Sequence, residues 1–142
     1  MTELRVATRG DVGGIQRVRH SVRENRLTSR VIPDEEVVDF LERRGRGWVI
    51  EADGEVVAFA IGNRETGNIW ALFVDPAHER RGYGRRLHDT MVAWLWSSGL
   101  ARLWLSTEPR TRAQAFYERA GWRPLGLLPS GELAFELEAP ER

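Results

Sequence analysis

The stretch that decides the fold reads Ile-Trp-Ala-Leu-Phe-Val-Asp-Pro-Ala-His-Glu-Arg-Arg-Gly-Tyr-Gly-Arg-Arg-Leu and runs from Ile69 to Leu87. Six consecutive apolar residues open it, and such a run predicts a strand buried on both faces. The strand ends at Asp75-Pro76, because proline has no N–H to donate to a neighbouring strand. After Gly82 and Gly84 the apolar residues recur at helical spacing, so a helix is predicted to begin there.

The loop between this strand and this helix is suited to holding phosphate. Its glycines allow a close approach of the backbone, and the free N–H groups and the helix dipole point at the same place. Four arginines lie within seven residues beside the helix start: Arg80, Arg81, Arg85 and Arg86. That density favours phosphate binding over ordinary surface charge.

The chain before this stretch predicts a strand, two helices and two hairpin strands. These elements fall at residues 3–9, 11–25, 33–44, 48–52 and 55–61. Asp11 is a plausible N-cap, and Asp53-Gly54 is a strong signal for a two-residue hairpin turn. An antiparallel meander that ends with the 69–74 strand is therefore expected.

The chain after this stretch predicts two helices and three strands, at residues 82–98, 102–106, 111–120, 122–128 and 132–138. Thr111-x-x-Gln114 has the form of a capping box. The last strand alternates, with its carboxylates expected to face outward. The order β-α-α-β-β-β-α-β-α-β-β implies an α+β fold, with a mixed, mostly antiparallel central sheet flanked by helices.

Composition narrows the classes of function. At 142 residues the chain fits a single domain, 1–142. A net charge of zero gives no global sign of nucleic-acid or membrane binding. The absence of cysteine excludes disulfides, thiolate metal sites and a cysteine nucleophile, and the three histidines lack the spacing of a zinc site. With no apolar run that resembles a signal peptide or a membrane span, a cytoplasmic location is expected.

Two motifs resemble those of the GNAT N-acetyltransferase superfamily. Glu79-Arg80-Arg81-Gly82-Tyr83-Gly84 is similar to the pyrophosphate loop of that family. Ala113-x-x-Phe116-Tyr117-Glu118-x-x-Gly121-Trp122 is similar to its later helix. A single glycine loop is weak evidence, but two motifs in the right order, separated by the expected strand, are much stronger.

The sequence departs from the family pattern at three positions. Glu79 stands where the family prefers glutamine or arginine, and a carboxylate there would repel pyrophosphate, so Glu79 is expected to point away or to pair with an arginine. Arg110 stands where the family often has asparagine. Trp70 occupies the position of the glutamate base that many members carry in the central strand.

The resemblance implies acetyl-CoA as cosubstrate, without a metal. Phe73 and Val74 are expected to offer backbone groups to the pantetheine, one of them as an oxyanion donor. The pyrophosphate is expected to bind the glycine loop and its neighbours, which are Arg80, Arg81, Gly82, Tyr83, Gly84 and Arg85. Arg110 is expected to be a further contact. Tyr117 is the expected general acid, since a phenol of pKa about 10 stays protonated at neutral pH. Helical spacing alone favours a core aromatic at this position, and the two motifs together reverse that preference.

The general base is left open by the sequence. Glu24 is the first candidate and, with Asn25, ends the first helix, which in this family borders the acceptor site. Glu132 and Glu136 on the last strand are further candidates, and a water chain or an amine that arrives neutral would need no dedicated residue. The histidines His20 and His88 are placed on helix surfaces and are weaker candidates.

The leading hypothesis is an acetyl-CoA-dependent N-acetyltransferase that acts on a primary amine of a small molecule or protein, by direct attack in a ternary complex. The main alternative is a non-catalytic acyl-CoA-binding or regulatory module, which the missing strand glutamate favours. A nucleotide or nucleic-acid binder using the arginine cluster is a third hypothesis, opposed by the zero net charge. Partners are therefore acetyl-CoA and an amine, and the family leaves a homodimer open.

Overall fold

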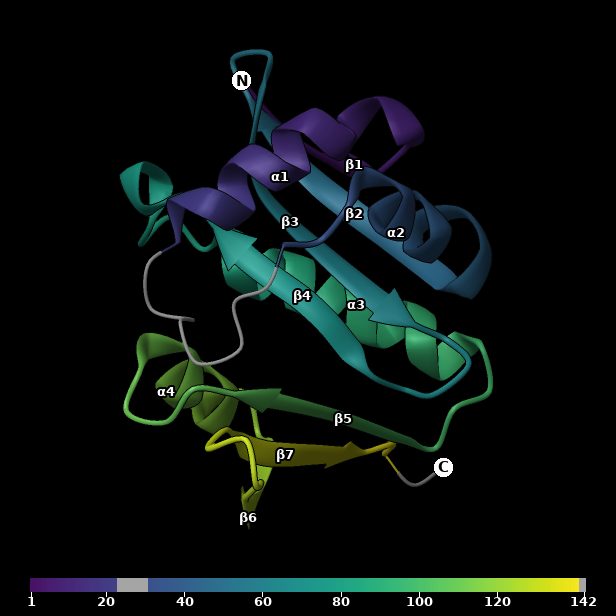
Figure 1. The fold of residues 1–142 in the computed structure, drawn as a ribbon, viewed down its shortest axis with the longest axis vertical. Helices are drawn as coiled ribbons and strands as arrows, with labels where there is room; N and C mark the ends of the chain where they lie inside the picture. The colour runs from purple at the N-terminus through teal and green to yellow at the C-terminus, as the bar shows by residue number, and fades with distance from the viewer. Residues whose placement is uncertain (23–30, 141–142) are drawn as a thin grey trace.

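The computed structural model describes residues 1–22 and 31–140, which form two small sheets with helices around them (Figure 1). The first sheet is antiparallel and has the strand order β1 (Thr2–Val6), β2 (Gly45–Ala52), β3 (Glu55–Asn63) and β4 (Ile69–Val74). The second is also antiparallel and has the order β5 (Arg102–Thr107), β7 (Leu133–Glu138) and β6 (Arg123–Leu127). The helices are α1 (Val12–Ser21), α2 (Asp34–Asp39), α3 (Tyr83–Ser97) and α4 (Arg112–Arg119).

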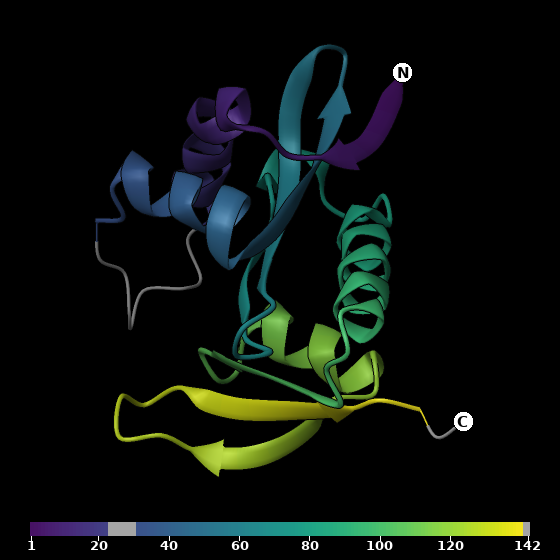
Figure 2. The same ribbon diagram turned by 90° about the vertical axis from the view of Figure 1, so that its right-hand side faces the viewer.

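This architecture confirms the predicted α+β class and element order. Helix α2 continues as a π-helix over Phe40–Arg44 and ends at Gly45, where the predicted stop lies. In Figure 2, α1 and α2 lie on one side of the first sheet and α3 lies on the other. The sheet is therefore the middle layer, and the side chains of its central strands must fill two cores.

Strand β3 is buried on both faces along almost its whole length. Its side chains alternate: Phe59 and Ile61 belong to the core beneath α1 and α2, whereas Ala58 and Ala60 belong to the core beneath α3. All four are at most 1% exposed. The small alanines on the α3 side leave room for the helix to approach the sheet closely, with Leu87, Met91 and Leu95 filling the space between.

Strand β4 is less buried than its apolar sequence predicts. Only Ile69 and Ala71 are buried, while Trp70, Leu72 and the two residues that follow are partly exposed. The expectation of burial on both faces is wrong because β4 is hydrogen-bonded to β3 along one edge, and its other edge opens onto a cavity. An apolar run can line a ligand cavity as well as a core, and the sequence pattern does not separate the two.

The last hairpin also corrects an expectation. The side chain of Glu138 is 61% exposed, as expected, but Glu132 and Glu136 are 8% and 7% exposed, so these two carboxylates are not open to solvent. Glu136 is neutralised by Arg102, at 2.8 Å between Nε and Oε1, and by the guanidinium of Arg123. Burial of a carboxylate is tolerated here because cationic side chains cover it.

A pair of glycine-to-alanine substitutions tests how closely β2 packs against β3. A Cβ on Gly45 would lie 1.8 Å from the carbonyl oxygen of Gly62, so Gly45→Ala must displace β2 from β3 and is expected to lower the free energy of unfolding by about 1–3 kcal/mol. The same change at exposed Gly13 of α1 meets nothing within 4 Å, and it should raise that free energy by about 0.5–1 kcal/mol. Urea unfolding followed by circular dichroism measures both; a Gly45→Ala variant as stable as Gly13→Ala contradicts the described register.

Candidate active site

The two sheets meet at one point and then separate. Asn68 and Trp104 form an isolated parallel bridge, and the amide of Trp104 donates to the carbonyl of Gly67 at 3.0 Å. Beyond this bridge, no pairing joins β4 to β5 within the described residues. Two strands linked through a helix normally pair in parallel, and here this pairing is a single bridge, after which the strands diverge (Figure 1).

A cavity of about 920 Å³ lies between the diverging strands. Its walls come from β4, the loop before α3, the first turn of α3, the end of β5 and helix α4. Seven of the nine residues expected to bind the cosubstrate line it: Phe73, Val74, Arg80, Gly82, Tyr83, Gly84 and Arg85. Arg81 and Arg110 do not line it, and their contacts to a ligand stay predictions.

The unpaired edge of β4 supplies backbone groups to the cavity. The amide of Asp75 donates to the carbonyl of Val57 at 2.8 Å, and inter-strand bonds alternate along an antiparallel pair. By this alternation the backbone groups of Phe73 point to β3, and those of Leu72 and Val74 point away from it. The expectation that Phe73 offers backbone groups therefore needs correction: Phe73 lines the cavity with its side chain, and Leu72 joins Val74 as the source of free backbone groups.

The first turn of α3 presents N–H groups to the same cavity. Gly82 is the N-cap with φ +79°, a left-handed conformation that glycine adopts without steric cost, and no side chain of residues 1–22 or 31–140 caps the helix. The first N–H groups of a helix have no partner within it. Gly84 lies against the cavity floor, where a Cβ would be 3.6 Å from Phe116 and 3.7 Å from Val74.

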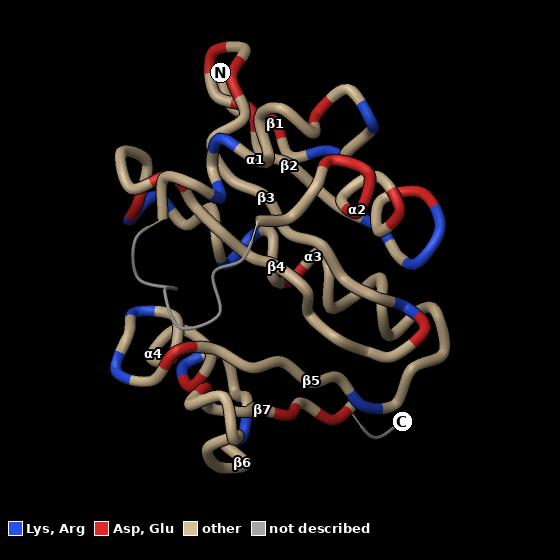
Figure 3. The backbone as a smooth tube through the Cα atoms, in the orientation of Figure 1, with Lys and Arg blue, Asp and Glu red and all other residues tan. Residues whose placement is uncertain are grey.

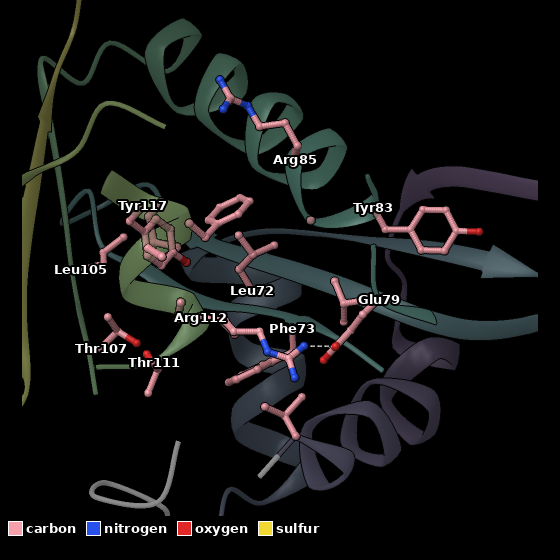
Figure 4. A pocket seen from close by; sticks show the side chains of 18 of the residues that line it. Leu72, Phe73, Glu79, Tyr83, Arg85, Leu105, Thr107, Thr111, Arg112 and Tyr117 are labelled. Carbon is pink, nitrogen blue, oxygen red and sulfur yellow. Dashed lines mark hydrogen bonds and ion pairs between the residues drawn. The ribbon is translucent and has the colours of Figure 1, made fainter. Parts of the chain in front are cut away.

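Charge around the loop is partly paired. Glu79 forms an ion pair with Arg112 of α4, which confirms that this carboxylate pairs with an arginine (Figure 4). Arg85 contacts Asp89 at 3.0 Å, one helical turn further along α3. Arg80 lies at φ +64° in the loop and lines the cavity. The loop therefore keeps net positive charge beside the uncapped helix, and both features attract an anion.

Helix α4 begins with the predicted cap. The Thr111 hydroxyl accepts from the amide of Gln114 at 3.3 Å, while the Gln114 side chain accepts from the amide of Arg110 at 2.7 Å. The second bond of the capping box thus goes one residue earlier than the motif specifies. Arg110 has φ +64°, and its backbone N–H is used to cap α4.

Tyr117 lies in the wall of the cavity, on the inner face of α4. Its side chain is packed at ring-centroid distances of 5.2 Å from Phe116, 5.6 Å from Trp122 and 6.2 Å from Phe135, and its phenol faces the space between β4 and β5 (Figure 4). Burial raises the pKa of the Tyr117 hydroxyl. The phenol is therefore protonated at neutral pH, the state that a proton donor needs.

His88 supports this aromatic cluster from α3. It is 4% exposed, so its expected placement on a helix surface is wrong. The indole N–H of Trp122 donates to Nε2 of His88 at 2.9 Å, and Nδ1 lies 2.9 Å from Asp89. Burial holds the pKa of His88 below its usual range, against the opposing effect of Asp89. The imidazole is therefore neutral, with Nε2 as acceptor, and it positions the residues beside Tyr117.

The candidates for a general base differ in how they lie relative to the cavity. Glu24 and Asn25 lie outside the described residues. Glu136 is held by two arginines, away from both β4 and the cavity. Glu132 accepts a hydrogen bond from Ser106 at 2.8 Å. Ser106, which lines the cavity from β5, is a site residue that sequence reasoning missed; its position at the end of a strand parallel to β4 was the available signal.

No metal site and no membrane span emerge from residues 1–22 and 31–140. These residues hold no cluster of three or more His, Asp or Glu side chains that could bind a metal ion. They also contain no helix whose length and apolar character would let it cross a membrane.

Comparison with known proteins assigns the chain to a family. Residues 15–122 match the sequence pattern of the Acetyltransferase (GNAT) family. The chain belongs to this family. The predicted family is confirmed by a match over three quarters of the chain.

Curated relatives match over part of their length. A mycothiol acetyltransferase of Beutenbergia cavernae is 34% identical over 86 residues, which are 56% of this chain and 29% of that protein. A [ribosomal protein bS18]-alanine N-acetyltransferase of Haemophilus ducreyi is 30% identical over 73 residues, 49% of this chain and 50% of that protein. The chain thus spans half or less of the length of these relatives.

Solved structures share the fold over the whole chain. The PaiA N-acetyltransferase of Thermoplasma acidophilum, in complex with coenzyme A, has a TM-score of 0.84 at 14% identity and covers 98% of this chain and 99% of its own. YncA, a putative acetyltransferase from Salmonella typhimurium with acetyl-CoA, has a TM-score of 0.82 at 18% identity over 99% of this chain and 95% of its own. At such low identity the likeness establishes the fold.

The His88 cluster predicts a pH dependence of stability. Because the pKa of His88 is lower in the folded protein than the ordinary value of about 6.5, the unfolded chain binds the proton more readily, and stability should fall as pH drops below about 6.5. In His88→Gln the amide oxygen can accept the Trp122 N–H without titrating, so part of this loss should disappear. Melting temperatures at about pH 7.5 and about pH 5.5 measure the effect.

The matched control is His20→Gln, which removes an exposed imidazole of α1. It should keep the pH dependence of the unmodified protein. An identical loss of melting temperature on acidification in all three proteins would show that His88 is not held neutral by burial.

Proposed function

We propose that this chain is an acetyl-CoA-dependent N-acetyltransferase that transfers an acetyl group to a primary amine by direct attack in a ternary complex. One observation carries the proposal: the cavity has an uncapped helix start beside arginines at one end and a protonated, buried tyrosine in its wall. A ligand that combines a diphosphate with a thioester has the matching chemistry at its two ends. The complexes of similar folds with coenzyme A and acetyl-CoA support the same choice.

Residues of the loop and of α3 would hold the diphosphate. Arg80 of the loop and Tyr83, Gly84 and Arg85 of the first turn of α3 line that end of the cavity. Free N–H groups at a helix start bind phosphate oxygens and gain from the helix dipole. The side chain of Tyr83 is buried and points away from the cavity in Figure 4, so this residue would contribute through its backbone.

The edge of β4 would hold the pantetheine arm. An extended chain carrying amide groups can bond to the unpaired backbone of Leu72 and Val74 as an added strand would. One of these N–H groups is suitably placed to stabilise negative charge on the thioester oxygen, which is worth several kcal/mol in comparable sites. Phe73 and Phe116 give the arm apolar walls.

The chemistry needs two proton transfers. The amine nitrogen forms a bond to the carbonyl carbon and the carbon–sulfur bond breaks, so a proton must leave the nitrogen and one must reach the thiolate. Tyr117 would donate to the thiolate and be reprotonated by the proton that the nitrogen loses. Burial raises the pKa of the Tyr117 hydroxyl, so the phenol keeps its proton until a thiolate forms beside it.

A non-catalytic acyl-CoA-binding module is the alternative that one feature favours. Trp70 stands where a strand glutamate would act as base, and its ring is stacked on Phe40 at a centroid distance of 3.8 Å. Nucleic-acid binding receives no such support, because acidic and basic segments are interspersed in the view of Figure 3. Turnover with an amine separates catalysis from binding alone.

The role of Tyr117 can be tested by Tyr117→Phe. Removing the proton donor should lower kcat about 100-fold or more, while the affinity for coenzyme A should change little because the ring is kept. Release of free thiol from acetyl-CoA with a panel of primary amines gives kcat, and calorimetry gives the affinity.

Ser97→Ala is the control for this test, since it removes a hydroxyl of α3 that bonds only to the carbonyl of Trp94 within the helix, at 2.7 Å. It should leave kcat unchanged. Equal rates for Tyr117→Phe and Ser97→Ala would remove Tyr117 from catalysis. Coenzyme A binding without turnover on any amine would favour the binding module.

A further inference from the structure

His88 and Asp89 of α3 form a polar pair that lies outside the walls of the cavity. His88 is 4% exposed, and its Nδ1 lies 2.9 Å from Oδ1 of Asp89. The same carboxylate oxygen accepts a hydrogen bond from Nε of Arg85 at 3.0 Å. The proposed function uses Arg85 to bind phosphate, but it gives His88 and Asp89 no step of their own. A buried imidazole with polar partners on both of its nitrogens therefore calls for a separate explanation.

The partner on the other side of the imidazole fixes which nitrogen carries the proton. Nε1 of Trp122 lies 2.9 Å from Nε2 of His88, and an indole N–H can only donate a hydrogen bond. Nε2 must therefore be the acceptor, and the single proton of the neutral ring is on Nδ1, facing the Asp89 carboxylate. Burial, which holds the pKa of His88 below its usual range, favours this neutral form. The carboxylate thus orients the imidazole, and the imidazole orients the indole.

Trp122 is joined to Tyr117 in two ways. The ring centroids of the two side chains are 5.6 Å apart in an edge-to-face arrangement. The amide of Trp122 also donates to the carbonyl of Tyr117 at 3.0 Å, across the turn that ends α4. Both residues belong to the buried core. Because such a core is close-packed, a displacement of Trp122 must also shift Tyr117.

The direction of the Tyr117 phenol depends on the rings around it. In the described part of the chain its hydroxyl has no hydrogen-bond partner. Its neighbours Phe116 and Phe135 carry no polar side-chain atom, so the hydrogen bond from Trp122 to His88 is what gives this cluster a fixed orientation. A proton donor must lie within hydrogen-bonding reach of its acceptor, and a misplacement of about 1 Å can cost about 100-fold in rate.

We propose that His88, oriented by Asp89, is a positioning residue for proton transfer: it holds Trp122 by the indole N–H, and Trp122 keeps the Tyr117 hydroxyl directed at the departing thiolate. The inference rests on the proposed function. It gives His88 an effect on the chemical step and none on the binding of coenzyme A, because His88 and Trp122 do not line the cavity.

The first test separates kcat from binding. His88→Leu removes the acceptor and leaves the indole N–H of Trp122 buried without a partner. It should lower kcat about 10-fold or more, while KM for acetyl-CoA and the calorimetric affinity for coenzyme A stay within about twofold. In His88→Gln the amide oxygen can accept the indole N–H, so kcat should recover to within about threefold of the unmodified protein. Trp122→Phe, which removes the donor but keeps a ring, should lose kcat as His88→Leu does.

The second test asks whether His88 acts through the phenol. In a Tyr117→Phe background no hydroxyl is left to position, so His88→Leu should lower kcat there by less than about twofold. Equal losses in both backgrounds would overturn the proposal, because His88 would then support the fold alone. A His88→Gln variant as slow as His88→Leu, or a loss of coenzyme A affinity that matches the loss of kcat, would overturn it as well.

Thr90→Val is the matched control on α3, since it removes a hydroxyl that donates to the carbonyl of Arg86 within the helix, at 2.9 Å. It should leave kcat unchanged in both backgrounds. Melting temperatures show that each variant is folded at the assay temperature. Unchanged kcat in Tyr117→Phe alone would overturn the role of Tyr117 and this proposal together. Absence of turnover on every amine would overturn the proposed function itself, and thiol release from acetyl-CoA by the unmodified protein detects that outcome separately.

Discussion

The separation of β4 from β5 is the constraint on which the rest of the structure depends. A sheet normally pairs every interior edge, because unpaired N–H and C=O groups shielded from water are costly. Among residues 1–22 and 31–140, pairing stops after the bridge of Asn68 and Trp104, and nothing pairs with the edge of β4 along Leu72 and Val74. A folded chain keeps such an edge where a ligand can satisfy it, and the large cavity lies there.

The elements around the gap place different chemical groups at its end and in its wall. At one end the uncapped start of α3 offers N–H groups and positive charge; in the wall α4 places Tyr117 within an aromatic cluster. The two ends are tied together by the ion pair between Glu79 and Arg112 and by His88, which links α3 to Trp122. Glu79, the carboxylate expected to repel phosphate, thus holds α4 near the loop.

Local patterns predicted the fold well, and they predicted contacts across the gap poorly. The glycine turn at Asp53-Gly54, the cap at Thr111 and the two family motifs depend on neighbours in sequence, and each lies where it was expected. The burial of His88 and the bond between Ser106 and Glu132 depend on partners 34 and 26 residues away. The periodicity of apolar residues along the chain does not predict such pairs. The apolar run of β4 was mistaken for core because a cavity wall has the same composition as a core.

The central claim is that the gap between β4 and β5 is the binding site of acetyl-CoA. A crystal structure with bound coenzyme A tests it most directly. The account predicts the diphosphate on the N–H groups of residues 83–85, the pantetheine bonded to the backbone of Leu72 and Val74, and the sulfur within hydrogen-bonding reach of the Tyr117 hydroxyl. Coenzyme A bound elsewhere, with β4 and β5 closed into a continuous ladder, would contradict it.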